Sequence, residues 1–199
     1  MFGNIYKNKK VLVTGHTGFK GTWLITWLIN LGAKVVGISK DTPTKPSMFE
    51  ELNLKDKIKH YQENIKDLPK ISEIIANEKP EFLFHLAAQP IVSTSYRDPI
   101  ETISSNIMGT TNILEALRIS NHHCMAIIIT SDKAYDNTEQ VWGYKENDLM
   151  GGKDIYSGSK GAAELIFKSY YHSFFKSAET NVRLAVARAG NVIGGGDWA

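Results

Sequence analysis

The sequence predicts an α/β protein built on a doubly wound parallel sheet, with helices on both faces. Two observations lead to this class. Short apolar runs alternate with amphipathic helical patterns along the chain, and a glycine-rich turn follows the first apolar run. Strands that are apolar almost throughout are buried on both faces, as in a parallel sheet between two layers of helices. Ligands of such a sheet bind beyond the carboxyl ends of its strands.

The expected elements follow in chain order. Strands are expected over residues 11–14, 34–38, 59–62, 82–86, 126–130 and 183–189. Helices are expected over residues 21–31, 66–78, 106–120 and 157–175. In the first helix Trp23 and Trp27 share a stripe with leucines, so we expect both indoles in the core. His85 is interpreted as a core histidine of the fourth strand.

Composition narrows the class of protein. The 199 residues are enough for one large domain with a substantial core. The net charge is only +2, and acidic and basic residues are interspersed along the chain. The sequence therefore shows no basic cluster of the kind that binds nucleic acid. The lone Cys124 excludes an internal disulfide framework, and no His/Cys cluster suggests a metal. Without a leader-like or membrane-length apolar run, we expect a cytoplasmic protein.

The glycine-rich turn reads "VTGHTGFKGTWL", with Gly15, Gly18 and Gly21 between the first strand and the first helix. Glycines permit a tight turn whose backbone approaches a pyrophosphate, and the helix N-terminus attracts its charge. This strand–turn–helix context predicts a dinucleotide site of the Rossmann type.

The end of the second strand bears on the choice of dinucleotide. Asp41 lies 20 positions after Gly21, where an acid binds the adenosine ribose of NAD. Its neighbour Lys40 would instead favour the 2′-phosphate of NADP. We expect NAD, with NADP as the alternative. A further interpretation is that Asp41 is a solvated loop residue with no role in binding.

Catalytic side chains are expected at two places. The stretch "AIIITSDKAYDN" ends a buried strand with Ser131, Asp132 and Lys133, and "YSGSK" places Tyr156 and Lys160 four residues apart on one helix face. A phenol with a pKa near 10 is a poor base, and a neighbouring ammonium would lower that pKa.

These stretches, with "FHLAAQPIV", "SNIMGTTNILEA", "WGYKEN" and "RAGNVIGGGDWA", resemble the extended short-chain dehydrogenase/reductases, and among them the nucleotide-sugar 4,6-dehydratases. The resemblance runs from residue 11 to the end of the chain. It implies a bound NAD and a nucleotide-sugar substrate, with CDP-glucose expected from the "SDK" spelling. The implied reaction oxidises C4, expels water across C5 and C6, and returns hydride to C6.

The resemblance also implies residue roles. Tyr156 would be the base, Ser131 would hold the 4-oxygen, and Asp132 would protonate the departing C6 hydroxyl. Lys160 would bind the nicotinamide ribose. Lys133 stands where the dTDP-glucose enzymes have an acid, so it would be either the C5 base or an enolate stabiliser. The implied cofactor-binding residues are Gly15, His16, Thr17, Gly18, Phe19, Gly21, Asp41, Asn64, Ile65, Ala87, Ala88, Asn106, Tyr156 and Lys160. The implied substrate-binding residues are Gln89, Ser131 and Asn191.

Two expectations concern the whole assembly. The helices that carry Asn106 and Tyr156 are expected to form a homodimer, as in relatives. Relatives also continue beyond "GGGDWA" into a sugar-nucleotide domain, so residues 1–199 are expected to be the NAD-binding domain. The chain would then be a piece of a longer dehydratase, or an NAD-binding module without turnover. An epimerase is a third reading, which the acid at Asp132 disfavours.

Overall fold

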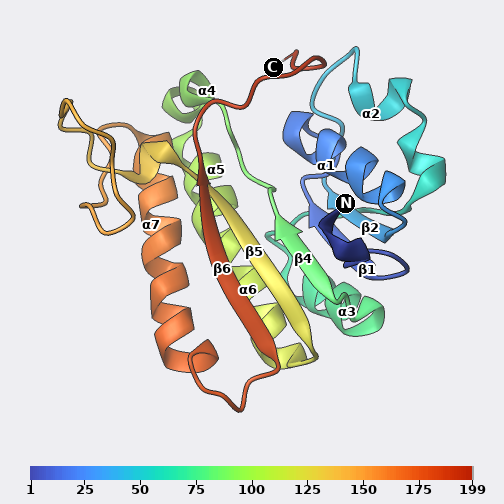
Figure 1. The fold of residues 1–199 in the computed structure, drawn as a ribbon. Coiled ribbons are helices and arrows are strands. Elements are labelled where there is room, and N and C mark those ends of the chain that lie inside the picture. The colour runs from blue at the N-terminus through green and yellow to red at the C-terminus, as the bar shows by residue number, and fades with distance from the viewer. Residues whose placement is uncertain (199) are drawn as a thin grey trace.

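Six parallel strands form one sheet in the order β3-β2-β1-β4-β5-β6 (Figure 1). They are β1 (Lys10–Thr14), β2 (Lys34–Ser39), β3 (Lys59–Gln62), β4 (Phe82–His85), β5 (Cys124–Ser131) and β6 (Val182–Ala189). The computed structural model describes residues 1–198. The strand order reverses between β1 and β4, which confirms the doubly wound class and opens a crevice there.

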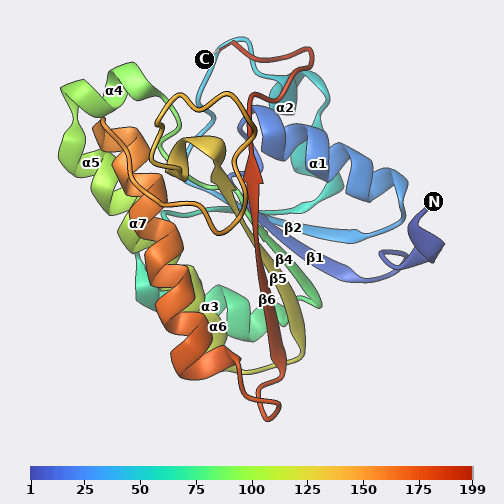
Figure 2. The same cartoon turned by 60° about the vertical axis from the view of Figure 1, so that its left-hand side comes forward.

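Helices cover both faces of the sheet (Figure 2). One face carries α3 (Leu68–Glu78), α6 (Gly109–Ser120) and α7 (Ile155–Tyr170), and the other carries α1 (Phe19–Asn30) and the short α2 (Met48–Glu51). The remaining helical pieces are α4 (Val92–Arg97), α5 (Pro99–Ile103), the π-helical turns η3 (Ser104–Met108) and η5 (Tyr171–Phe175), and the short turns η1 (Phe2–Asn4), η2 (Leu54–Lys57) and η4 (Asp132–Ala134).

The helix expected from residue 106 begins earlier, because α5 and η3 lead directly into α6. The Asp98 carboxylate accepts a hydrogen bond from the Glu101 amide (3.0 Å), and Pro99 occupies the first helical turn. An aspartate cap followed by proline is a strong helix start. The signal was therefore present in the sequence, about two helical turns before the predicted boundary at residue 106.

The prediction that the two tryptophans are core residues is wrong. Trp23 and Trp27 are 49% and 47% exposed, and α1 buries Ile25 and Leu28 instead. The Trp23 indole donates to the Gly195 carbonyl (2.9 Å). In contrast, His85 is a core residue as predicted, with 2% exposure.

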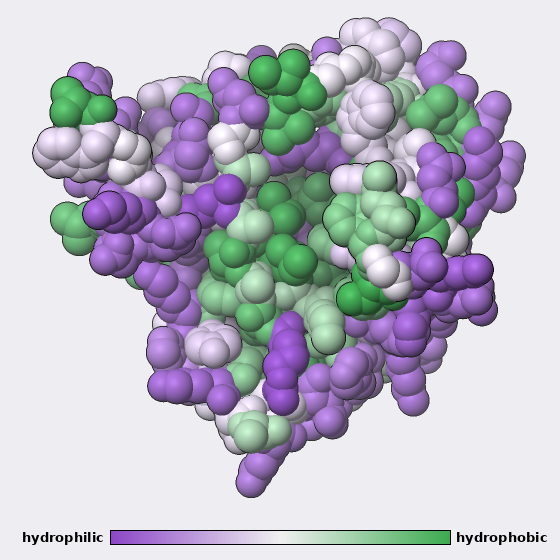
Figure 3. Space-filling model, viewed as in Figure 1, coloured by the Kyte–Doolittle hydropathy of each residue, from purple (hydrophilic) through white to green (hydrophobic). Residues whose placement is uncertain are grey.

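The face of the sheet that carries α1 is only partly covered. Met125 in β5 and Ala185 and Ala187 in β6 are exposed there. Figure 3 shows hydrophobic side chains gathered in a hollow over β4, β5 and β6. No helix of the described residues is long and apolar enough to cross a membrane.

Candidate active site

The carboxyl ends of the strands enclose a cavity of about 770 Å³, a volume typical of ligand sites. Its wall comes from the loop after β1, the segments after β2, β3 and β4, the end of β5, the first turn of α7 and the segment after β6. The predicted residues on this wall are Gly15, Thr17, Gly18, Phe19, Gly21, Asp41, Asn64, Ile65, Ala87, Ala88, Gln89, Ser131, Asp132, Lys133, Tyr156 and Asn191.

The glycine turn has no space for side chains at its two ends. Gly15 has a φ of +72°, and a Cβ there would lie 2.7 Å from the Ala87 nitrogen. A Cβ at Gly21 would lie 2.1 Å from the Gly15 carbonyl oxygen. Gly18 caps α1 without a side-chain hydrogen bond, so no cap side chain takes up the first amides of the helix. A diphosphate fits this arrangement, because the first amides of α1 and the positive end of its helix dipole lie at the cavity and attract an anion.

His16 differs from its predicted role as a direct cofactor contact. Its ring is fully buried behind the cavity wall, where Nδ1 lies 3.0 Å from Ser39 Oγ and Nε2 lies 2.8 Å from His60 Nδ1. Burial, with the positive charge of His60, lowers the pKa of His16 to about 4. The neutral imidazole therefore ties the glycine turn to β2 and β3.

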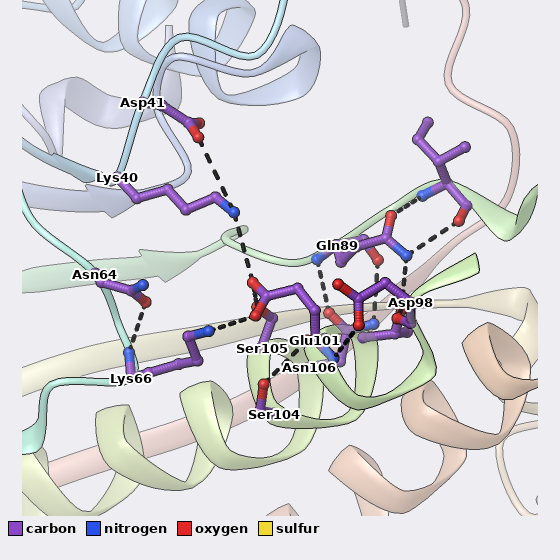
Figure 4. A network of polar contacts seen from close by, with 12 residues as sticks. Lys40, Asp41, Asn64, Lys66, Gln89, Asp98, Glu101, Ser104, Ser105 and Asn106 are labelled. Atoms are coloured by element: carbon purple, nitrogen blue, oxygen red, sulfur yellow. Dashed lines mark hydrogen bonds and ion pairs between the residues drawn. The ribbon is translucent and has the colours of Figure 1, made fainter. Parts of the chain in front are cut away.

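The end of β2 is tied to the same turn. The Thr17 hydroxyl donates to the Asp41 carbonyl (2.7 Å), while the Asp41 carboxylate is 58% exposed at the cavity. Lys40 lies between two carboxylates, Asp41 (4.0 Å) and Glu101 (3.5 Å), and Glu101 also pairs with Lys66 (Figure 4). Glu101 thus shares the charge of Lys40 with Asp41, and both Lys40 and Asp41 line the cavity.

Asn106 also lies behind the wall, with 1% exposure. Its carbonyl accepts from the Gln89 amide (2.8 Å), and its amide donates to the Gln89 carbonyl (3.1 Å) (Figure 4). The same amide donates to the Ser159 hydroxyl (2.9 Å). Asn106 was predicted among the cofactor-binding residues, and its contacts are those of a residue that holds the loop after β4 against α7.

The end of β5 brings three predicted catalytic residues onto one wall. The Ser131 hydroxyl donates to the Asp132 carboxylate (3.1 Å) and accepts from the Lys133 amide (3.3 Å). The turn η4 follows at once, so Asp132 and Lys133 leave the strand with exposed side chains on the cavity wall.

Tyr156 and Lys160 come from the first turns of α7, which starts where the Asp154 carboxylate accepts from the Ser157 amide (2.9 Å). The Lys160 ammonium lies 5.9 Å from the centre of the Tyr156 ring. Lys160 is 8% exposed, and burial lowers its pKa to about 8.

The expected lowering of the phenol pKa is wrong for the protein by itself. Burial raises the pKa of Tyr156, opposed by a hydrogen bond with Ser131 and reinforced by the charges of Asp132 and Asp154. Desolvation penalises a phenolate more than the partly buried site stabilises it.

A buried ion pair supports both catalytic elements. Glu164 of α7 and Arg188 of β6 lie 2.6 Å apart with side chains 2% and 12% exposed. Glu164 also accepts from the Thr130 hydroxyl (2.6 Å), directly before Ser131. The Arg188 guanidinium stacks on Tyr135, 4.4 Å from the ring centre. The pair therefore joins α7 to the ends of β5 and β6.

The structure adds three charged residues to the cavity wall that the sequence argument missed: Lys20, Glu63 and Asp197. Lys20, inside the glycine turn motif, lines the cavity together with Asp132 and Asn191. A cation within a phosphate-binding motif was the available signal. Within residues 1–198, no group of histidines, cysteines and acids is placed to hold a metal ion.

The sheet is parallel and has a glycine turn at its switch point, Ser131 and Tyr156 line the cavity there, and Lys160 lies buried beside the Tyr156 ring. This arrangement defines the short-chain dehydrogenase/reductase class of protein. The sequence profile of the GDP-mannose 4,6 dehydratase family matches residues 12–184. The chain belongs to that family.

Among its relatives is the CDP-glucose 4,6-dehydratase of Salmonella typhimurium, 52% identical over 98% of this chain and 55% of the relative. The chain thus spans about half the length of that protein. The UDP-glucose 4-epimerase of Thermotoga maritima, solved with UDP-glucose, is 25% identical with a TM-score of 0.76 over 90% of this chain and 54% of the epimerase. MoeE5, solved with UDP-glucose and NAD, shares the fold at 24% identity with a TM-score of 0.76, over 94% of this chain and 56% of MoeE5.

Proposed function

We propose that residues 1–199 form the NAD-binding and catalytic part of a nucleotide-sugar 4,6-dehydratase that acts on CDP-glucose. The observation that carries the proposal is the shared wall of Ser131, Asp132, Lys133 and Tyr156 beyond the end of β5. A dehydrogenase that only oxidises an alcohol needs the hydroxyl and the phenol. The added acid and cation supply what the loss of water requires.

The cofactor is proposed as NAD, held by Gly15, Gly18 and Gly21 at its diphosphate and by Asp41 at its adenosine ribose. The exposed Asp41 carboxylate favours a ribose hydroxyl over a 2′-phosphate, and the charge of Lys40 is already met by Asp41 and Glu101. When bound, NAD supplies the hydride acceptor for C4 and the hydride donor for C6.

The residues act in sequence on the sugar. Ser131 holds the 4-oxygen, and Tyr156 takes the proton of the 4-hydroxyl. Asp132 then gives a proton to the departing C6 oxygen. Lys133 either removes the C5 proton in its neutral form or, charged, stabilises the enolate oxygen. Asn191, at the cavity wall after β6, is proposed to bind the substrate diphosphate.

A homodimer is proposed through the helical segments that carry Asn106 and Tyr156, which are α5, η3 and α6 on one side and α7 on the other. Ile100 of α5, Met108 of η3 and Leu165 of α7 are 73%, 51% and 55% exposed. A second copy would bury them, since oligomers most often form closed two-fold pairs.

The test is a substrate panel with the native protein that carries residues 1–199. With NAD present, CDP-glucose should lose one water and gain a keto group, read by mass spectrometry, and UDP-glucose should react far more slowly. A preference for UDP-glucose would reassign the nucleotide. Epimerisation without water loss would overturn the dehydratase.

A further inference from the structure

Glu101 of α5 pairs with lysines that follow two neighbouring strands. Its carboxylate lies 3.5 Å from the ammonium of Lys40, which follows β2, and pairs with Lys66, which follows β3 (Figure 4). The Ser105 hydroxyl, four residues further along the chain, donates to the same carboxylate (2.9 Å). These three partners fix the carboxylate between the ends of β2 and β3.

Glu101 lies behind the wall of the active-site cavity. Among the described residues, Lys40, Asp41 and Ser105 line the cavity, whereas Glu101 and Lys66 do not. Glu101 therefore influences a ligand in the cavity through its charge and through the wall residues that it contacts, without touching the ligand itself.

The charge of Glu101 completes a balanced group at this end of the cavity. The hydrogen bond from Lys66 lowers the pKa of Glu101, against the effect of burial, so the carboxylate is ionised at neutral pH. Lys40 also lies 4.0 Å from Asp41, so two cations and two carboxylates form one group. Their charges cancel, and the group therefore has no net positive charge with which to attract a further anion.

We propose that Glu101 is a specificity-determining residue, which selects an unphosphorylated adenosine ribose by pairing with Lys40. The inference rests on the proposed function, which places that ribose at Asp41. A 2′-phosphate would bring about two further negative charges to this position, where it would meet two carboxylates and a lysine already shared between them. Removing the charge of Glu101 would leave Lys40 and Lys66 against Asp41 alone, and the group would then attract the phosphate.

Calorimetry with the native protein that carries residues 1–199, freed of bound nucleotide, tests this selection. Glu101→Gln removes the charge and retains an oxygen for the Ser105 hydroxyl. We expect it to tighten NADP binding about 5- to 30-fold and to change NAD binding by less than about twofold. The gain should shrink severalfold between about 50 mM and about 500 mM salt, because an electrostatic effect is screened and a change of shape is not.

Two further variants serve as controls. Glu115→Gln also removes a carboxylate from an ion pair with similar exposure (22% for Glu115 against 27% for Glu101), and it should change the binding of neither cofactor. Adding Lys40→Met to Glu101→Gln removes the cation through which Glu101 acts, so the double variant should lose the gain for NADP.

The proposal is overturned if Glu101→Gln leaves the ratio of NADP to NAD affinity within about twofold of the wild type. It is also overturned if the gain survives Lys40→Met or does not respond to salt. All of these results leave the proposed function standing, because the binding of NAD to the wild type is measured in the same series. A wild type that binds neither cofactor would instead remove the proposed function itself.

Discussion

The Asn106 amide donates to the Ser159 hydroxyl over 2.9 Å, and so joins the turn before α6 to the helix that carries Tyr156 and Lys160. The same side chain holds Gln89 by its backbone, at the cavity edge. One buried amide therefore fixes the loop after β4 relative to α7.

Replacing Asn106 with Ala should lower the free energy of unfolding by about 1–3 kcal/mol, because buried groups of Gln89 and Ser159 lose their partner. Urea denaturation measures the loss. Thr111→Ala, in the adjoining helix α6, is the control, since the Thr111 hydroxyl bonds only to the Ile107 carbonyl. Equal losses in both variants would contradict a special role for Asn106.

Breaking the Glu164–Arg188 pair should lower the free energy of unfolding by more than the Asn106 substitution does. Glu164→Gln leaves the Arg188 guanidinium without its carboxylate in a nearly buried site, so we expect a loss of about 3–5 kcal/mol. Glu115→Gln breaks a more exposed pair with Arg118 and should cost less than about 1 kcal/mol. A small loss in Glu164→Gln would mean that water reaches Arg188.

Lys160 predicts a pH dependence of stability. Its pKa is about 8 in the folded chain against an ordinary value of 10.5. Between these values the unfolded chain holds a proton that the folded chain lacks, so stability rises with pH. Relative to Lys160→Met, the wild type should gain about 2–3 kcal/mol between about pH 7.5 and pH 10. Urea titrations of both proteins measure this, and a constant difference would show that Lys160 titrates normally.

The catalytic roles predict distinct stalled steps in the native protein that carries these residues. Tyr156→Phe should suppress oxidation, and with it both reduced-cofactor absorbance and C5 hydrogen exchange. Asp132→Asn should permit oxidation but block loss of water, so reduced cofactor accumulates. Each general acid or base should cost about 10² to 10⁴ in rate.

Lys133→Met separates the two roles left open for that lysine. Loss of C5 exchange while reduced cofactor still forms identifies Lys133 as the base. Retained exchange with slower turnover identifies it as the enolate stabiliser. Normal turnover in Asp132→Asn would refute the proposed acid.

The proposed dimer predicts that Ile100→Glu weakens association by about 100-fold or more, since a charge would enter an apolar contact. Sedimentation of the wild type should show a concentration-dependent dimer. Val141→Glu, at a 94% exposed position, is the control and should leave the dimer intact. A wild type that is monomeric at all concentrations rules the interface out.

Local sequence patterns determined the sheet and the strand ends that build the site. Apolar runs separated by helical periods predict parallel strands, and the glycine spacing predicts the turn at β1. The Tyr156 and Lys160 spacing likewise sets their common helix face. These signals are readable because each depends on residues within one turn or one strand.

Only the tertiary structure decided which of these residues reach the cavity and which stand behind it. His16 and Asn106 are buried supports, and Lys20 lines the wall, because segments up to 172 positions apart, as in the contact of Trp23 with Gly195, pack against the same turn. The phenol pKa of Tyr156 was also decided there, since desolvation depends on everything that surrounds the ring. The burial of a side chain and the electrostatic field around it depend on all the residues that surround it, many of them distant in the chain. Local periodicity and spacing do not encode those neighbours.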